Sequence, residues 1–261
     1  MKIMDLDIEH EDLYFNCLED WSEQMKEAGD HKRNWYSNMK DKGLKVKLAF
    51  DDSGSAGGMI QYYPAEYSNT DGKDMYFISC IWVHGHKEGR GNYQGKGMGE
   101  ALLTAAEEDA AGSGASAIAA WGLWLPFWMR AAWYKKHGYV KTDSDGMAVL
   151  LWKRFKDGAV PPKWIRQRKK PSGEKGRVVV TAFIHGGCPA QNIVFERALK
   201  AANEFEGKVD FVKIDTSVRE TFLEWGIRDA LFIDGKQIMT GPPPSYEKLR
   251  KIIWKKVKRL H

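Results

Sequence analysis

The chain has 261 residues, of which 43% are hydrophobic and 29% charged, and its formal net charge is +5. This length suggests two domains, and the apolar content excludes a wholly disordered chain. The three cysteines (Cys17, Cys80 and Cys188) are too few for a disulfide framework or a cysteine-rich zinc site, so we expect free thiols in a reducing compartment.

The sequence gives no indication of a membrane segment. Residues 1–11 are charged, unlike a secretory leader. The longest nearly apolar run, 115–129, is interrupted by Ser116, Gly122 and Pro126, and it is shorter than the roughly 20 residues that a membrane helix needs. We therefore expect a cytoplasmic protein with no membrane partner.

Hydrophobic periodicity in the first part of the chain predicts alternating strands and helices. The expected strands are residues 1–6, 46–50, 58–63, 75–83, 117–121 and 147–152. The expected helices are residues 11–27 and 100–111 and a third helix that has Pro126 in its first turn and ends at Gly138.

Residues 153–177 carry ten basic side chains against two acidic ones and include Pro161, Pro162 and Pro171, which is typical of a linker between domains. Beyond the linker, the pattern predicts strands at 177–184, 209–214, 230–233 and 237–239, and helices at 190–206, 218–225 and 246–260. We expect a first domain at 1–155, a linker at 156–176 and a small α/β domain at 177–261.

The most informative motif follows the strand 75–83. Gln94-Gly95-Lys96-Gly97-Met98-Gly99 stands immediately before the helix at 100–111. Small residues let backbone N–H groups converge, and the helix start adds its positive dipole end, so the segment can hold a pyrophosphate. Its spacing fits neither the dinucleotide-binding nor the Walker pattern, and a flexible surface loop is the other interpretation.

Gln94-x-x-Gly97-x-Gly99 resembles the acyl-CoA loop of the GNAT N-acetyltransferase superfamily, and Tyr134, four residues before Gly138-Tyr139, resembles a second element of that family. The resemblance covers residues 1–155, and the whole chain looks like the YoaP-like acetyltransferases. It implies an α/β protein with the α+β GNAT fold, a central mixed sheet flanked by helices, and a second, smaller thioredoxin-like domain. The long loop at 84–91 and Phe127 depart from the family pattern.

The resemblance also implies a function, which is transfer of an acetyl group from acetyl-CoA, as co-substrate, to an amine. It implies Tyr134 as the general acid for the leaving thiolate. The implied cofactor-binding residues are Ile81, Trp82, Val83, Gln94, Gly95, Lys96, Gly97, Met98 and Gly99. A non-catalytic acyl-CoA-binding or sensing module is the alternative.

Several chemical roles remain open at the level of sequence. The candidate general bases are Tyr76, Ser79, Glu66 and His84. We expect no metal, because the pair His84 and His86 lacks further ligands nearby in the sequence. Trp124, Phe127 and Trp128 form either ordinary core or an aromatic wall that suits an aromatic, apolar or cationic small-molecule amine. We do not expect a nucleic-acid partner, because the basic tail at 248–259 also has the apolar stripe of an amphipathic helix.

Residues 178–191 resemble the first strand and helix start of a thioredoxin-like domain, with Cys188 at the redox position. Gln191 replaces the second cysteine of that family, and Arg228-Asp229-Ala230 stands where the family carries a proline. Both departures argue against disulfide exchange. We expect a binding or interface domain, and a monothiol redox protein acting through Cys188 is the alternative.

Overall fold

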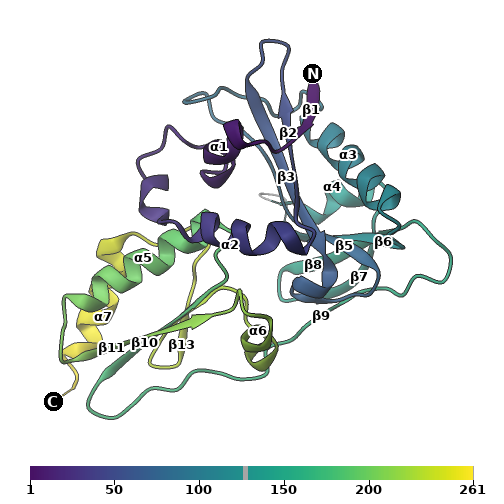
Figure 1. Ribbon diagram of the computed structural model, residues 1–261. Helices are drawn as coiled ribbons and strands as arrows, with labels where there is room; N and C mark the ends of the chain where they lie inside the picture. Colours follow the sequence, from purple (N-terminus) through teal and green to yellow (C-terminus); the bar gives the residue numbers. More distant parts are fainter. Residues whose placement is uncertain (126–128, 261) are drawn as a thin grey trace. The chain divides into compact units, whose positions relative to one another are not determined.

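The computed structural model describes residues 1–125 and 129–260 and divides into two compact units (Figure 1). The first unit comprises Met1–Trp21 and Asn38–Ile165, and the second comprises Ser22–Ser37 and Arg166–His261. The domain limits expected from the sequence stay a prediction. The units differ from those limits in that Ser22–Ser37, near the N-terminus, packs with the C-terminal part of the chain.

Seven strands form the sheet of the first unit in the order β1-β2-β3-β5-β6-β8-β7. Neighbouring strands run antiparallel except β5 and β6, which are parallel. In chain order the strands are β1 (Lys2–Asp5), β2 (Lys45–Phe50), β3 (Ala56–Pro64), β5 (Met75–Val83), β6 (Ala117–Leu123), β7 (Val140–Asp145) and β8 (Ala148–Arg154), and the short strands β4 (Thr70–Asp71) and β9 (Lys163–Trp164) pair separately. The expected α/β class, with a central mixed sheet flanked by helices, is confirmed.

Helices cover both faces of this sheet (Figure 1). Apolar side chains at 98, 102, 103, 106 and 110 give α3 (Met98–Gly112) one buried face, which shares a core with α4 (Ala131–Lys136) and with Ile60 and Tyr62 of β3. Gln61 lies between those two residues and therefore points to the opposite face. There its Oε1 accepts a hydrogen bond of 2.7 Å from Tyr14 of α1 (Glu11–Phe15).

The predicted helix at 11–27 is wrong. α1 ends at Phe15, and Cys17 and Leu18 adopt left-handed backbone angles (φ 52° and 64°) that no helix continues through. α2 (His31–Met39), which the pattern did not predict, follows the turns. Short 3-10 helices lie at η1 (Ile8–His10), η2 (Met25–Ala28), η3 (Lys40–Lys42) and η4 (Ala65–Tyr67).

Two further differences concern the strand-rich end of the first unit. Pro126, expected in the first turn of a helix, lies outside the described residues, and α4 begins at Ala131. β7 was not predicted, because its sequence, Val140 to Asp145, is mostly polar and half-exposed and has little apolar alternation.

The second unit has a four-stranded sheet in the order β11-β10-β12-β13. β10 (Val178–Ile184) pairs in parallel with β11 (Val209–Asp215) and antiparallel with β12 (Ala230–Ile233), which pairs with β13 (Lys236–Ile238). α5 (Pro189–Asn203) and α7 (Tyr246–Val257) share one core over the sheet, and Trp225 of α6 (Arg219–Trp225) packs on another core with Phe183 and Phe232 (Figure 1). The predicted strands and helices of this part are confirmed to within three residues.

Candidate functional site

A slot opens in the middle of the first sheet. β5 pairs with β3 along nearly its whole length, whereas the β5–β6 ladder joins only Met75 to Ile78 with Ala117 to Ala120. A register shift between Gln61 and Tyr62 marks a bulge at the level of Ser79. Beyond it the two parallel strands separate, and the Ser79 carbonyl accepts a hydrogen bond of 2.9 Å from Trp121 Nε1. The backbone of residues 80–83 is thereby left without a strand on its β6 side.

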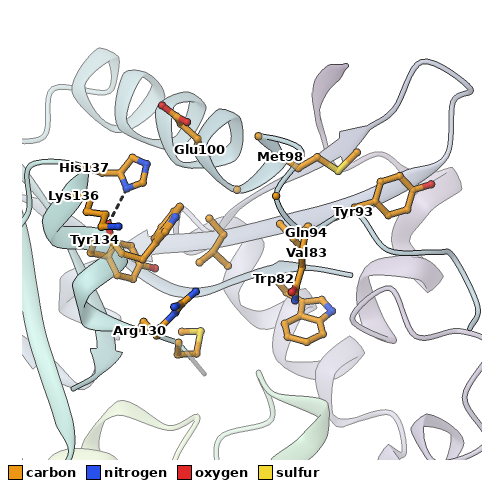
Figure 2. A pocket seen from close by; sticks show the side chains of 16 residues that line it. Trp82, Val83, Tyr93, Gln94, Met98, Glu100, Arg130, Tyr134, Lys136 and His137 are labelled. Atoms are coloured by element: carbon orange, nitrogen blue, oxygen red, sulfur yellow. Dashed lines mark hydrogen bonds between the residues drawn. The ribbon is translucent and has the colours of Figure 1, made fainter. Parts of the chain in front are cut away.

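A pocket of about 700 Å³ lies at this slot (Figure 2). Nine of the ten site residues expected from the sequence line it, namely Ile81, Trp82, Val83, Gln94, Gly95, Gly97, Met98, Gly99 and Tyr134. Lys96 does not line the pocket, and its ammonium lies 5.1 Å from the centre of the Tyr93 ring. The structure therefore brings the glycine motif, the strand end and the tyrosine to one place, while their binding roles stay a prediction.

The start of α3 forms one wall of the pocket. Gly97 is its N-cap residue, and no side chain caps the helix there. Gly95 and Gly97 have φ angles of 75° and 83°, which other residues rarely adopt, so the loop needs glycine at these positions. The first N–H groups of a helix have no partner within the helix, so this end can receive an anion. Arg130 and Lys136 add positive charge to the lining, and Glu100 adds negative charge.

Tyr134 is buried in the pocket wall on α4. Its ring packs edge-on against those of Trp133 and Tyr139, at centroid distances of 5.0 and 5.2 Å. Its hydroxyl is buried and has no hydrogen-bond partner among the described residues. Burial, with a smaller contribution from Cys80, raises the pKa of Tyr134 far above its usual value. The phenol therefore keeps its proton at physiological pH and has a free donor.

The candidate bases expected from the sequence do not line this pocket. Ser79 Oγ accepts a hydrogen bond of 2.8 Å from Gln61 Nε2 in the buried network of α1. His84 is fully buried and uses both nitrogens, because Nε2 accepts from Trp21 Nε1 at 3.2 Å and Nδ1 donates to the Gly91 carbonyl at 2.7 Å. That network gives His84 a structural role. Tyr76 packs on Tyr62, at 5.8 Å between ring centres, and Glu66 is exposed on η4.

Glu19 is a candidate that sequence reasoning missed, because it carries no motif and fell within the wrongly predicted helix. It is half-buried, and burial raises its pKa while His86 and, to a smaller degree, His84 lower it. The two histidine rings are 5.4 Å apart, and His86 is 6.4 Å from the ring of Trp82. Figure 2 shows the Trp82 side chain pointing away from Glu100 of α3 and from His137, so Trp82 lies on the face of β5 opposite α3.

The expected aromatic wall is described only in part. Trp124 is 67% exposed, and Phe127 and Trp128 lie outside the described residues. Trp82 lines the pocket, and its Nε1 is buried without an acceptor among the described residues. In the same described part of the chain, no group of three or more histidine, cysteine or acidic residues is placed to hold a metal ion, and no helix is long and apolar enough to span a bilayer.

In the second unit, Cys188 is half-buried at the N-cap of α5 and is not in a disulfide. The neighbouring His185 is buried, and its Nδ1 accepts a hydrogen bond of 3.2 Å from Arg228. Burial and, to a smaller degree, Arg228 lower the pKa of His185 well below its usual value, so its ring is neutral. Asp229 accepts a hydrogen bond of 2.9 Å from the His185 backbone N–H. The cluster holds the loop that precedes α5.

The family model of the acetyltransferase (GNAT) family matches residues 7–139, and the chain belongs to this family. No curated protein matches the chain. Among solved structures, it is similar to the PaiA N-acetyltransferase from Thermoplasma acidophilum in complex with coenzyme A, with 19% identity over 59% of this chain and 100% of that one and a TM-score of 0.42.

Two further solved structures are similar at the same level. The GNAT family N-acetyltransferase YhbS from Escherichia coli, in complex with CoA, is 14% identical over 62% of this chain and 88% of its own, with a TM-score of 0.44. A GNAT family acetyltransferase from Brucella melitensis, in complex with acetyl-CoA, is 16% identical over 61% of this chain and 90% of its own, with a TM-score of 0.41.

Proposed function

We propose that this cytoplasmic protein transfers an acetyl group from acetyl-CoA to the amine of a small-molecule acceptor. The observation that carries the proposal is the meeting of an uncapped, glycine-rich helix start and an unpartnered buried hydroxyl at one slot in the sheet. The backbone of Ile81, Trp82 and Val83 would hold the pantetheine arm. The segment from Gln94 to Gly99 would hold the pyrophosphate, with Lys96 as added charge.

In this reaction the neutral amine attacks the thioester carbonyl carbon, so that a C–N bond forms and the C–S bond breaks. The amine loses a proton, and the leaving thiolate gains one. We assign Tyr134 as the acid, because its hydroxyl has no competing partner within residues 1–125 and 129–260 and keeps its proton. With a raised pKa, it donates a hydrogen bond to the sulfur and gives up the proton only as negative charge develops there.

We assign Glu19 as the group that receives the proton of the amine. Its carboxylate does not line the pocket itself but lies close enough to His86 and His84 for both to lower its pKa, and the His86 ring lies 6.4 Å from that of Trp82 in the pocket lining. A half-buried carboxylate suits an ammonium group, and the Trp82 ring in the pocket lining suits an aromatic or apolar body. We therefore propose a primary amine that is cationic in water as the acceptor class.

Calorimetric titration with acetyl-CoA and with CoA tests the cofactor. We expect a dissociation constant on the order of micromolar for the wild type and its loss in Gly97→Glu, which places a negative charge at the helix start. Gly146→Glu is the matched control, since Gly146 also has a positive φ, 54°, and open space around it, but lies in the β7–β8 turn. Equal affinity in both variants would contradict the proposed cradle.

A non-catalytic acyl-CoA-binding module would use the same pocket, so binding does not exclude it. Release of free thiol from acetyl-CoA in the presence of primary amines distinguishes the two. Turnover that depends on the amine supports the enzyme, whereas tight binding without any acyl transfer supports the sensing module.

For the second unit we propose a thioredoxin-like domain that serves binding rather than disulfide exchange, as in the YoaP-like acetyltransferases. The strand order, with a parallel β10–β11 pair followed by antiparallel β12 and β13, supports this classification. Cys188 has no second cysteine at Gln191. The alternative of a monothiol redox protein predicts a lowered thiol pKa, and titration of Cys188 near the ordinary value of about 8.5 would exclude it.

A further inference from the structure

The second unit includes residues 22–37, which lie in the sequence between two parts of the first unit. The chain leaves the first unit after Trp21, contributes residues 22–37 to the second, and returns at Asn38. Within the second unit, η2 and the first part of α2 pack along α5. The segment is therefore tied at both ends to the first unit by covalent bonds and along its length to the second by side-chain contacts.

An arginine holds the first half of this segment. Arg197 of α5 donates two hydrogen bonds to Glu27, from Nε at 2.8 Å and Nη2 at 2.9 Å, and its third nitrogen donates to the Pro244 carbonyl at 3.0 Å. The Arg197 side chain is only 11% exposed. The hydrogen bond from Arg197 is the main cause of the lowered pKa of Glu27. Because the two parallel hydrogen bonds of such a pair need a defined geometry, the pair fixes both the orientation of Glu27 relative to Arg197 and the distance between them.

The second half is held at the start of α5. His31 Nε2 lies 2.6 Å from Glu196 Oε1, and its ring packs edge-on against Phe195 at 5.2 Å. Trp35 is buried and lies 5.5 Å from the ring of His185. A Cβ at Gly186 would stand 3.0 Å from the His31 carbonyl, so the backbone that leads to Cys188 already touches α2. The end of the domain where a redox protein would need an open surface is occupied by this chain.

The residues just before the segment hold the long loop that departs from the family pattern. Asp20 accepts two hydrogen bonds from Arg90, at 3.0 and 2.9 Å, and Trp21 donates to His84. The Trp21 indole fits against the bare backbone of Gly89, where a Cβ would be 2.1 Å from Nε1. The loop continues into Tyr93 and Gln94, which line the pocket. Glu19 directly precedes these anchors.

We propose that the second unit is a clamp for residues 22–37, with Arg197 and Glu196 as positioning residues for the acyltransfer site. By fixing the segment that follows Trp21, the clamp holds Asp20 and Trp21 against the loop at 84–91, and with them Glu19 near His86. This inference rests on the proposed function, because it assigns the clamp a role in turnover.

Hydrogen exchange and steady-state kinetics on the full chain test the clamp together. In Arg197→Ala we expect faster amide exchange in both 22–37 and 84–91, and an increase in KM for the amine of at least fivefold, the low end of coupling between sites. Glu27→Ala removes the other half of the same contact, and Glu27 is 45% exposed, so this variant keeps the fold. The double variant should be no worse than either single one.

Arg177→Ala is the matched control, because it breaks another arginine–carboxylate pair of the second unit, with Asp210 at 2.6 Å, away from the segment. Unchanged exchange in 22–37 would overturn the clamp, and faster exchange there with unchanged exchange in 84–91 and unchanged kinetics would overturn its role in turnover. Failure of the proposed function has a different signature, namely a wild type that binds no acetyl-CoA. Exchange in 84–91 still reports the clamp in that case.

Discussion

Tyr134 has two properties that follow from its burial. Its hydroxyl is buried without a partner among the described residues, which costs free energy, and its environment favours the neutral phenol. A ligand sulfur or oxygen at the slot would satisfy the hydroxyl. At the scale of single residues, this is the strongest indication that the pocket receives a ligand.

Tyr134→Phe tests this assignment with minimal change of shape. We expect kcat to fall by roughly 10²- to 10⁴-fold, the range of general acid catalysis, with acetyl-CoA affinity retained. The melting temperature should stay equal or rise, because an unsatisfied buried hydroxyl is removed. Thiol release and calorimetry measure both quantities. A variant as active as the wild type would remove the acid role.

The role of Glu19 predicts a pH dependence. A base must be deprotonated, and burial raises the pKa of Glu19, so activity should fall on acidification through a pKa above the usual 4.5. Glu19→Gln should lower the amine-dependent kcat and abolish this acidic limb of the profile. Glu23→Gln is the control, since Glu23 is 85% exposed and forms an ion pair with Lys26 on the same turn. Identical pH profiles for the wild type and Glu19→Gln would contradict the assignment.

At the scale of elements, the site depends on how closely α4 approaches β6. Gly122 of β6 leaves no room for a side chain, because a Cβ there would stand 2.7 Å from the Met129 carbonyl oxygen and 2.8 Å from the Ala131 backbone nitrogen. Both contacts are backbone atoms at the start of the helix that carries Tyr134. The glycine thus sets the position of α4 relative to the slot.

Gly122→Ala should therefore destabilise the protein by about 1–3 kcal/mol, as overpacking does, and displace α4. We expect kcat to fall as well, since Tyr134 moves with the helix. Denaturant unfolding and thiol release measure the two effects. Gly112→Ala at the end of α3 has no neighbour within 4 Å and should be neutral or slightly stabilising. A Gly122→Ala variant with an unchanged free energy of unfolding would contradict this, because it would mean that the backbone of residues 129–131 shifts to make room without loss of stability.

The elements also show where sequence patterns suffice. Periodicity predicts the strands at 75–83 and 117–121 and the helix at 100–111, and the structure has all three within two residues. The glycine motif accounts for five of the nine pocket residues, and the strand end and Tyr134 account for the other four. The segment at 11–27 has an apolar stripe of helical spacing, yet Cys17 and Leu18 take left-handed angles because tertiary contacts outweigh propensity. Glu19 could not be found in the sequence, since only folding brings it near His86 and His84.

At the scale of the whole molecule, the connection between the units is not a single linker. The basic segment at 153–177 has the composition of a linker, but the chain passes between the two units three times, at 21/22, 37/38 and 165/166. Composition and periodicity are local properties of the sequence. They cannot show that residues 22–37 pack with the unit whose first sheet strand, β10, begins at Val178. Their partners, Glu196 and Arg197, are more than 160 residues away in sequence.

This shared segment gives a prediction about cooperativity. Amides in 22–37 should exchange with the opening of the second unit and not of the first, because their packing partners lie there. Leu249→Ala, in the core of α5 and α7, should destabilise the second unit by roughly 2–5 kcal/mol and accelerate exchange in 22–37. Leu102→Ala, equally buried in the core of α3, should accelerate exchange in α3 and leave 22–37 protected. If amide exchange in 22–37 instead became faster only in Leu102→Ala, the segment would open with the first unit. The second unit would then not stabilise the residues that lead to the pocket.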